Sequence, residues 1–195
     1  MSGRITEDSP TKGTHPYATS HQAGEDAVLI ESKKGSIEGV VVRLSNAFGP
    51  PVYNDVNCWM LLVNDLCRQA VNQQKLALNS LGRQKRDFVS LTNVCSAIIH
   101  LTECHLEHAD NYLFNIGGNW APSILEMSQK FSQRYAKLTG VVLEIKQNQD
   151  DNFSFFDSLD YSTEKLTSIG FVPSKDNSVN QELDDLIYFC LKNKD

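Results

Sequence analysis

The chain has 195 residues, which is enough for one domain or for one domain with a small lobe. Hydrophobic residues make up 41% of it and charged residues 22%, which excludes a disordered, collagen-like or fibrous protein. Lys and Arg total 18 against 24 for Asp and Glu, giving a net charge of −6. Binders of nucleic acid or of anionic membranes are normally basic, so we expect neither as a partner.

The cysteines and the N-terminal segment indicate a cellular compartment. Five cysteines are present, an odd number, and no CxxC or Cys/His spacing typical of zinc occurs. We therefore expect reduced, mostly buried thiols and no metal site. The segment MSGRITEDSP lacks the apolar core of a signal peptide, and no apolar stretch is long enough to span a bilayer. These features favour a soluble, cytoplasmic protein.

Predicted elements in the first quarter of the chain are a helix and a strand. Residues 1–16 are rich in Gly, Pro, Ser and Thr and predict a loop. Residues 17–32 predict a helix that ends at Gly35. The β-branched run IEGVVVRL at 37–44 is typical of a buried, parallel-type strand, and NAFGPP at 46–51 is expected to break it.

The remaining elements continue this alternation of helices and strands. Further helices are expected over residues 57–73, 93–104, 123–138, 162–169 and 181–192. Further strands are expected over residues 75–78, within 81–91, and over 112–116 and 141–145, with a turn at GGN (117–119) and a loop at 147–158. Strands that alternate with helices along a chain predict an α/β fold.

Five segments, taken in order, carry a pattern that covers nearly the whole chain. They are ITEDSP…HPYATSHQAGED (5–26), VVVRLSNAFGP (40–50), GRQKRDFVSLTNVCSAI (82–98), FNIGGNWAPSILEMSQK (114–130) and, more weakly, STEKLTSIGFVP (162–173). Their order and spacing resemble the C-terminal portion of an extended short-chain dehydrogenase/reductase. Within that group, the sequence is similar to the NAD-dependent epimerase/dehydratase family that acts on nucleotide sugars.

The resemblance implies a particular division of the chain. Residues 1–110 are expected to form a partial Rossmann-type region that carries the tyrosine helix and interleaved segments of a substrate-binding lobe. Residues 111–195 are expected to supply the remaining strand of the parallel sheet and the C-terminal part of a small α/β substrate-binding lobe. The family's glycine-rich GxxGxxG loop, which cradles the cofactor pyrophosphate, has no counterpart in this sequence.

Tyr17 and His21 are the catalytic candidates implied by the resemblance. The family places a tyrosine and a lysine four residues apart on one helix, where the ammonium lowers the tyrosine pKa and holds the nicotinamide ribose. His21 stands at the lysine position here. A protonated His21 can supply charge, and a neutral one can still hydrogen-bond a ribose hydroxyl. The alternative is that Tyr17 packs at the start of a helix and His21 is an ordinary surface residue.

The substrate-side candidates are Asn46 and Arg86, and the resemblance also places Ala47 and Phe48 against the nicotinamide. Ligands of open parallel sheets bind at the carboxyl ends of the strands, where Asn46 stands. A guanidinium such as that of Arg86 can grip a diphosphate with two hydrogen bonds. Strand alternation predicts that Lys85 points away from Arg86. The alternatives are a turn-forming Asn46 and an Arg86 that pairs with Asp87.

Two functions follow from these motifs. The resemblance implies an NAD(P)-dependent nucleotide-sugar epimerase or dehydratase that lacks the N-terminal cofactor-binding half, with a nucleotide sugar as substrate. The alternative is a non-catalytic truncated remnant, or a module that binds a nucleotide sugar or a protein. Partners implied by the family are a second copy of the chain or the missing N-terminal half, and the cofactor is NAD or NADP. Whether this chain alone binds that cofactor is doubtful, because the glycine-rich loop is absent.

Overall fold

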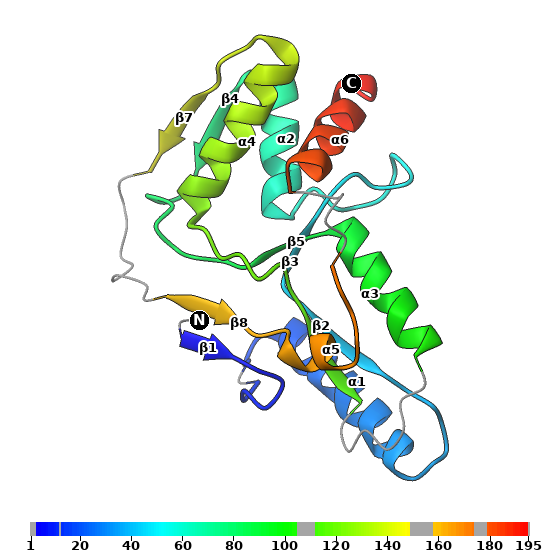
Figure 1. The fold of residues 1–195 in the computed structure, drawn as a ribbon. Helices are drawn as coiled ribbons and strands as arrows, with labels where there is room; N and C mark the ends of the chain where they lie inside the picture. The colour runs from blue at the N-terminus through cyan, green and yellow to red at the C-terminus, as the bar shows by residue number, and fades with distance from the viewer. Residues whose placement is uncertain (1–2, 12, 105–111, 149–157, 174–178, 195) are drawn as a thin grey trace.

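The computed structural model describes residues 3–11, 13–104, 112–148, 158–173 and 179–194 (Figure 1). Its helices are α1 (Pro16–Lys33), α2 (Leu62–Gln73), α3 (Leu91–Glu103), α4 (Ile124–Thr139), α5 (Glu164–Ser168) and α6 (Val179–Lys192). Its strands are β1 (Gly3–Ile5), β2 (Val41–Leu44), β3 (Asn46–Phe48), β4 (Lys75–Leu78), β5 (Phe88–Ser90), β6 (Leu113–Ile116), β7 (Glu144–Gln147) and β8 (Leu159–Tyr161).

The strands of the described residues pair in four parallel ladders, β1–β8, β2–β6, β3–β5 and β4–β7. Parallel strands need crossover connections, and the helices that alternate with these strands supply them. The predicted α/β class is therefore confirmed. The ladders β2–β6, β4–β7 and β1–β8 each join residues from before and after position 110, so the two segments of the chain are interleaved.

Helix α4 shows why the capping pattern predicted its bounds well. Ser123 accepts a hydrogen bond from the Glu126 N–H at 3.1 Å, and Glu126 accepts one from the Ser123 N–H at 2.7 Å. This capping box satisfies two N–H groups that the helix itself leaves free. Gly140 ends the helix in the left-handed conformation (φ 76°), which a residue without a Cβ adopts at little cost.

Two short strands lie where the sequence predicted irregular structure. Gly3–Ile5 forms β1 inside the expected N-terminal loop, and Asn46–Phe48 forms β3 inside the expected break after β2. Each strand has only three residues and is held by a partner that is distant in sequence, β8 for β1 and β5 for β3. A local pattern cannot show a partner so far along the chain, so these two predictions were wrong.

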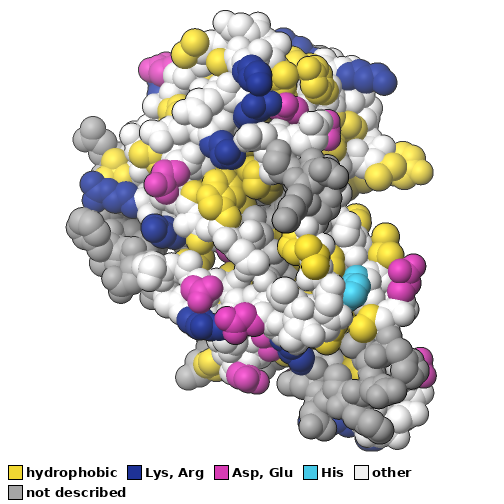
Figure 2. Space-filling view, in the orientation of Figure 1, with side chains coloured by type: hydrophobic (Ala, Val, Ile, Leu, Met, Phe, Trp, Pro, Cys, Tyr) yellow, Lys and Arg dark blue, Asp and Glu magenta, His cyan; other side chains and the backbone are white. Residues whose placement is uncertain are grey.

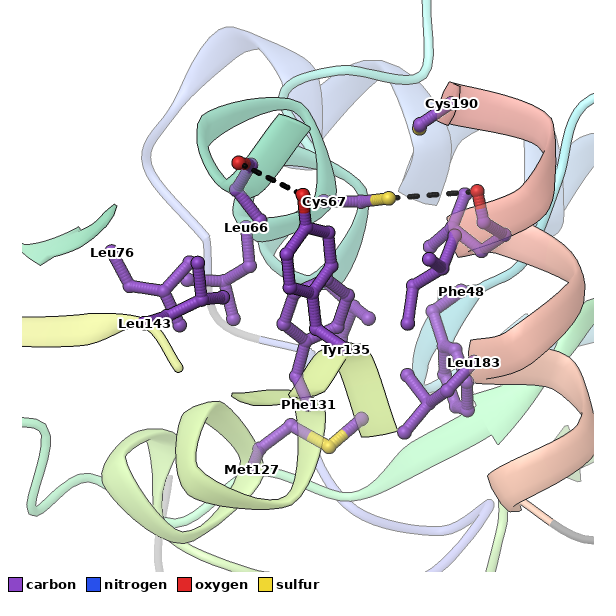
Figure 3. Close-up of a cluster of buried hydrophobic side chains, with 14 of the residues drawn as sticks. Phe48, Leu66, Cys67, Leu76, Met127, Phe131, Tyr135, Leu143, Leu183 and Cys190 are labelled. Atoms are coloured by element: carbon purple, nitrogen blue, oxygen red, sulfur yellow. Dashed lines mark hydrogen bonds between the residues drawn. The ribbon is translucent and has the colours of Figure 1, made fainter. Parts of the chain in front are cut away.

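Apolar side chains gather in two buried clusters. The larger cluster joins α2, α4 and α6 with β4 at one end of the molecule (Figures 1 and 3). It contains Phe131 and Tyr135, and the Tyr135 hydroxyl lies 3.4 Å from the carbonyl oxygen of Ala70. The smaller cluster packs α3 and α5 against β6, and the β3–β5 ladder lies between the two ends (Figure 1).

The described residues contain neither a membrane-spanning helix nor a cluster of metal ligands. None of the helices in these ranges is long and apolar enough to cross a membrane. Within the same ranges, no group of three or more His, Cys, Asp or Glu side chains is placed to hold a metal ion.

Candidate ligand-binding site

A cavity of about 540 Å³ lies just beyond the carboxyl end of β2. Its lining brings together both predicted substrate-side residues, Asn46 and Arg86, although 40 positions of sequence separate them. Side chains of β1 and β8 close its other side. The position agrees with the general rule that open parallel sheets bind ligands at the carboxyl ends of their strands.

Four cationic side chains line the cavity, and two of them already have carboxylate partners. The guanidinium of Arg43 donates to both carboxylate oxygens of Glu25 on α1, with the Nε–Oε2 distance at 2.9 Å. This hydrogen bond raises the pKa of Arg43 above its ordinary value. Arg4 lies 2.6 Å from Glu164, and both of those side chains are largely exposed. Arg43 and Arg4 therefore carry little free positive charge.

Lys85 and Arg86 are the other two cations. Among the residues that the structure describes, no carboxylate oxygen lies within 4 Å of either charged group. The expectation that Lys85 points away from Arg86 stays a prediction: the Arg86 side chain bonds that of Gln84, two residues before it, whereas the charge of Lys85 acts on Glu126 of α4. Both residues belong to the lining of the same cavity.

Asp87 fixes the geometry beside these cations. It is 2% exposed, and its carboxylate accepts hydrogen bonds from the backbone N–H groups of Gly118 (2.8 Å) and Trp120 (3.0 Å). The pairing of Arg86 with Asp87, which was one alternative, is therefore not formed. Arg86 instead donates to the side-chain oxygen of Gln84 at 3.3 Å.

The predicted turn at residues 117–119 is confirmed as the connection from β6 toward α4. A Cβ at Gly118 would overlap the carbonyl oxygen of Phe88, so only glycine lets the connection lie this close to β5. The connection therefore packs against β5, where its backbone N–H groups bind the Asp87 carboxylate.

Asn46 and Ser45 present polar groups to the cavity. The Asn46 side chain donates from Nδ2 to the Asp87 carbonyl oxygen at 2.9 Å, which orients its amide. In the described part of the chain its Oδ1 accepts no hydrogen bond. The Ser45 hydroxyl is buried and has no hydrogen-bond partner among the described residues. Buried hydroxyls are normally paired, so this one has an unmet hydrogen-bonding capacity beside the cavity.

Tyr17 and His21 lie on α1, outside this cavity. Tyr17 is 68% exposed, and the two ring centroids are 4.2 Å apart. Because Tyr17, His21 and Glu25 are spaced four residues apart, they share one face of α1. Glu25 binds Arg43 of the cavity, so this face is the one turned toward β2. The structure leaves the catalytic assignment of the two residues as a prediction.

The residues predicted to contact a nicotinamide do not meet in one cavity among the described residues. Phe48 is fully buried in the larger core cluster, and Ala47 packs against the smaller one. Neither lines the cavity that holds Asn46 and Arg86, nor do Tyr17 and His21. The described residues therefore do not by themselves outline a site for a nicotinamide cofactor.

Three residues of the site had no role in the sequence prediction. Ser45 lies inside the VVVRLSNAFGP segment but was not distinguished from its neighbours. Asp87 was considered only as a partner of Arg86. The Tyr161 hydroxyl lies 2.9 Å from the carbonyl oxygen of Arg43, and burial raises the pKa of Tyr161 well above its ordinary value. Nothing in the local sequence marks Tyr161, because its partners lie on other strands.

Comparisons with known proteins point to one family. A family model described as the NAD dependent epimerase/dehydratase family matches residues 2–117. Among curated proteins, the dTDP-D-glucose 4,6-dehydratase of Bos taurus is 26% identical over 127 residues, which are 65% of this chain and 34% of that protein. This chain thus spans about a third of the bovine relative's length.

Solved structures are similar over almost the whole chain. UDP-glucuronic acid 4-epimerase from Bacillus cereus, in complex with NAD, superposes with a TM-score of 0.77 at 19% identity, covering 100% of this chain and 58% of that one. MoeE5 in complex with UDP-glucose and NAD superposes with a TM-score of 0.70 at 21% identity, covering 99% of this chain and 61% of that one. These likenesses confirm a Rossmann-like fold.

Proposed function

Because this chain belongs to the NAD-dependent epimerase/dehydratase family, we propose that its cavity beyond β2 binds a nucleotide sugar. The diphosphate lies between Arg86 and Lys85, and the sugar or nucleotide hydroxyls lie against Asn46 and Ser45. Two cations suit a diphosphate, since a planar guanidinium binds two oxygens at once and an ammonium adds a point charge. The nucleotide-sugar complex of a similar fold supports this ligand class.

The observation that carries the proposal is the convergence of unpaired polar groups in one cavity. The Ser45 hydroxyl is buried without a partner, the Asn46 Oδ1 accepts no hydrogen bond, and Arg86 has no carboxylate. A buried polar group without a partner costs about 1–3 kcal/mol, so a ligand that pairs with it recovers that cost. On the face drawn in Figure 2, Lys and Arg side chains lie singly or in small groups among acidic and apolar ones. A few placed cations, rather than a broad basic surface, therefore hold the anion.

The full activity of the family is a second part of the proposal. The Tyr17 phenolate, stabilised by a protonated His21, accepts the proton of a sugar hydroxyl and becomes a neutral phenol. The short distance between the two rings, 4.2 Å, supports this pairing. A phenol near neutral pH is a weak base without such a neighbouring charge, so the step depends on His21 being cationic.

The third part of the proposal concerns a strand that would extend the parallel β2–β6 ladder at the outer edge of β2. The outer edge of β6 is closed by side chains, since Glu7 accepts from the Asn115 N–H and Lys165 donates to the Leu113 carbonyl, both at 2.8 Å. The outer edge of β2 carries the alternate residues Val42 and Leu44, and Leu44 is 46% exposed. We propose that a strand of a nicotinamide-cofactor-binding unit adds in parallel to β2. A second copy paired at this edge is the competing arrangement, and light scattering of the purified chain distinguishes them.

Ligand titration tests the binding proposal. Thermal-shift and calorimetric titrations use UDP-glucose, dTDP-glucose and NAD, each added separately to the purified chain. We expect a nucleotide sugar to raise the unfolding temperature, and Arg86→Ala to weaken its binding at least about tenfold. Arg83→Ala is the matched control, because Arg83 is exposed, three positions away and outside the cavity lining. Equal effects of the two variants, or no shift with either nucleotide sugar, contradict the proposal.

A further inference from the structure

Cys67 on α2 and Cys190 on α6 meet where these helices pack, in the core at the other end of the molecule from the proposed ligand cavity. Cys67 is fully buried and Cys190 is 6% exposed. The Cys67 thiol donates to the carbonyl oxygen of Leu186 at 3.5 Å (Figure 3). Leu186 lies one helical turn before Cys190, so the Cys67 sulfur is within a turn of Cys190.

Cys190 has an opening toward solvent that Cys67 lacks. A small cavity of about 140 Å³ is lined by Cys190 together with Trp59, Arg68, Phe189 and other side chains. The Arg68 guanidinium lies 5.8 Å from the centre of the Trp59 ring, which places its positive charge at the same cavity. A cavity of this size admits a molecule as small as hydrogen peroxide.

The surroundings of the two thiols differ in a way that separates their roles. The neighbouring Cys67 thiol lowers the pKa of Cys190, and the charge of Arg68 acts in the same direction. Burial raises the pKa of Cys67. Thiolates, not thiols, attack peroxides, and sensitive cysteines characteristically combine a low pKa, access and a nearby second cysteine.

We propose that Cys190 and Cys67 are a peroxide-sensitive pair that closes to a disulfide between α6 and α2. In the first step the Cys190 thiolate attacks hydrogen peroxide, so that a sulfur–oxygen bond forms, the oxygen–oxygen bond breaks and hydroxide leaves. In the second step the Cys67 sulfur attacks the Cys190 sulfenic acid, a sulfur–sulfur bond forms and water leaves with the Cys67 proton. Overall, two thiols are oxidised by two electrons and one peroxide is reduced to two waters.

The disulfide fixes the C-terminal helix to the core. Helix α6 is already held by the ion pair of Arg134 with Asp184 and by the 2.8 Å hydrogen bond from Thr92 to Glu182. Glu182 lies against Gly49, directly after β3. A covalent bond from α6 to α2 adds a constraint to the same contacts, so oxidation is expected to raise the unfolding temperature reversibly.

Peptide mapping of the oxidised wild-type chain tests the proposal. The reduced protein is treated with hydrogen peroxide, remaining thiols are blocked with N-ethylmaleimide, and the product is digested without reductant. We expect a mass loss of about 2 Da, the two hydrogens of a disulfide, and a linked peptide pair containing Cys67 and Cys190. Dithiothreitol is expected to reverse both the mass loss and the rise in unfolding temperature. A linkage through Cys58, Cys95 or Cys104 instead, or a modified Cys95 beside an unmodified Cys190, overturns the proposal.

Single variants separate the attacking from the resolving cysteine. Cys67→Ser is expected to accumulate a sulfenic acid at Cys190, which dimedone traps, whereas Cys190→Ser shows no disulfide mass loss. Cys95→Ser is the matched control, because Cys95 is exposed on α3 and its loss leaves the linkage intact. A disulfide mass loss that survives in Cys190→Ser contradicts the proposal. Because the wild-type mapping needs no substitution, it decides the question even where a variant fails to fold.

Discussion

The buried carboxylate of Asp87 offers a stringent test of how the ligand cavity is held. Substituting Asp87→Asn keeps the size of the side chain but turns one acceptor oxygen into an NH₂ donor. One of the N–H groups of Gly118 and Trp120 then faces a donor instead of an oxygen. The substitution therefore removes one hydrogen bond to a charged group. It also leaves the new NH₂ group and a buried backbone N–H facing each other without an acceptor.

The expected magnitude follows from these contacts. A hydrogen bond to a charged group contributes about 1.5–3 kcal/mol, and an unpaired buried donor costs about 1–3 kcal/mol. Relief from burying a charge offsets part of this sum, because Asp87 is only 2% exposed. We expect the free energy of unfolding to fall by about 3 kcal/mol, which lowers the unfolding temperature of a chain of this length by roughly 6–12 °C.

Urea unfolding followed by circular dichroism measures this loss, with an unchanged m-value as the sign that the unfolded state is unaffected. Asp160→Asn is the control, because Asp160 is 60% exposed and lies 3.7 Å from Arg4 at the surface. Exposed pairs of this kind contribute about 0–1 kcal/mol. A loss below about 1 kcal/mol in Asp87→Asn, or equal losses in both variants, refutes the role assigned to Asp87.

Two further predictions concern a buried acid and a glycine. Burial raises the pKa of Glu182 above its ordinary value, so the folded state binds more protons and stability falls as pH rises from about 4.3 through the raised pKa. Glu182→Gln is expected to remove this fall. The difference between the urea unfolding midpoints of the variant and of the wild type should therefore change with pH across this range, and a constant difference contradicts the prediction. Gly118→Ala is expected to destabilise by at least about 2 kcal/mol through overlap with Phe88, whereas Gly24→Ala in exposed α1 stabilises by about 0.5–1 kcal/mol. Thermal unfolding compares these two alanines, and equal effects exclude the overlap.

Elements with strong local signals were predictable from the sequence. Helix α4 has its capping box and its terminal Gly140, and the β-branched run before Asn46 gave β2, although that strand begins at Val41 rather than at residue 37. Strands β1 and β3 were missed because three residues carry almost no pattern and their partners lie far along the chain.

The site was predictable to the extent that its residues lie in recognisable segments. Asn46 and Arg86 were predicted separately, and the parallel topology brings them into one cavity. The unpaired hydroxyl of Ser45 and the position of Tyr161 could not be predicted, since both depend on the three-dimensional surroundings of a common residue type. Phe48 shows the reverse case, because its segment indicated a ligand contact and its side chain fills the core.

The central claim is that the cavity beyond β2 binds a nucleotide sugar, and the most direct measurement is a titration of the ¹⁵N-labelled chain with UDP-glucose, followed by NMR. The account predicts saturable shifts of the backbone signals of Ser45, Asn46 and Arg86, with little change at Trp59, which lies at the separate small cavity. Arg86→Ala is expected to shift the saturation point to at least about tenfold higher ligand concentration. Shifts confined to Trp59 and its surroundings, or no saturable shift at Ser45, Asn46 and Arg86, contradict the claim.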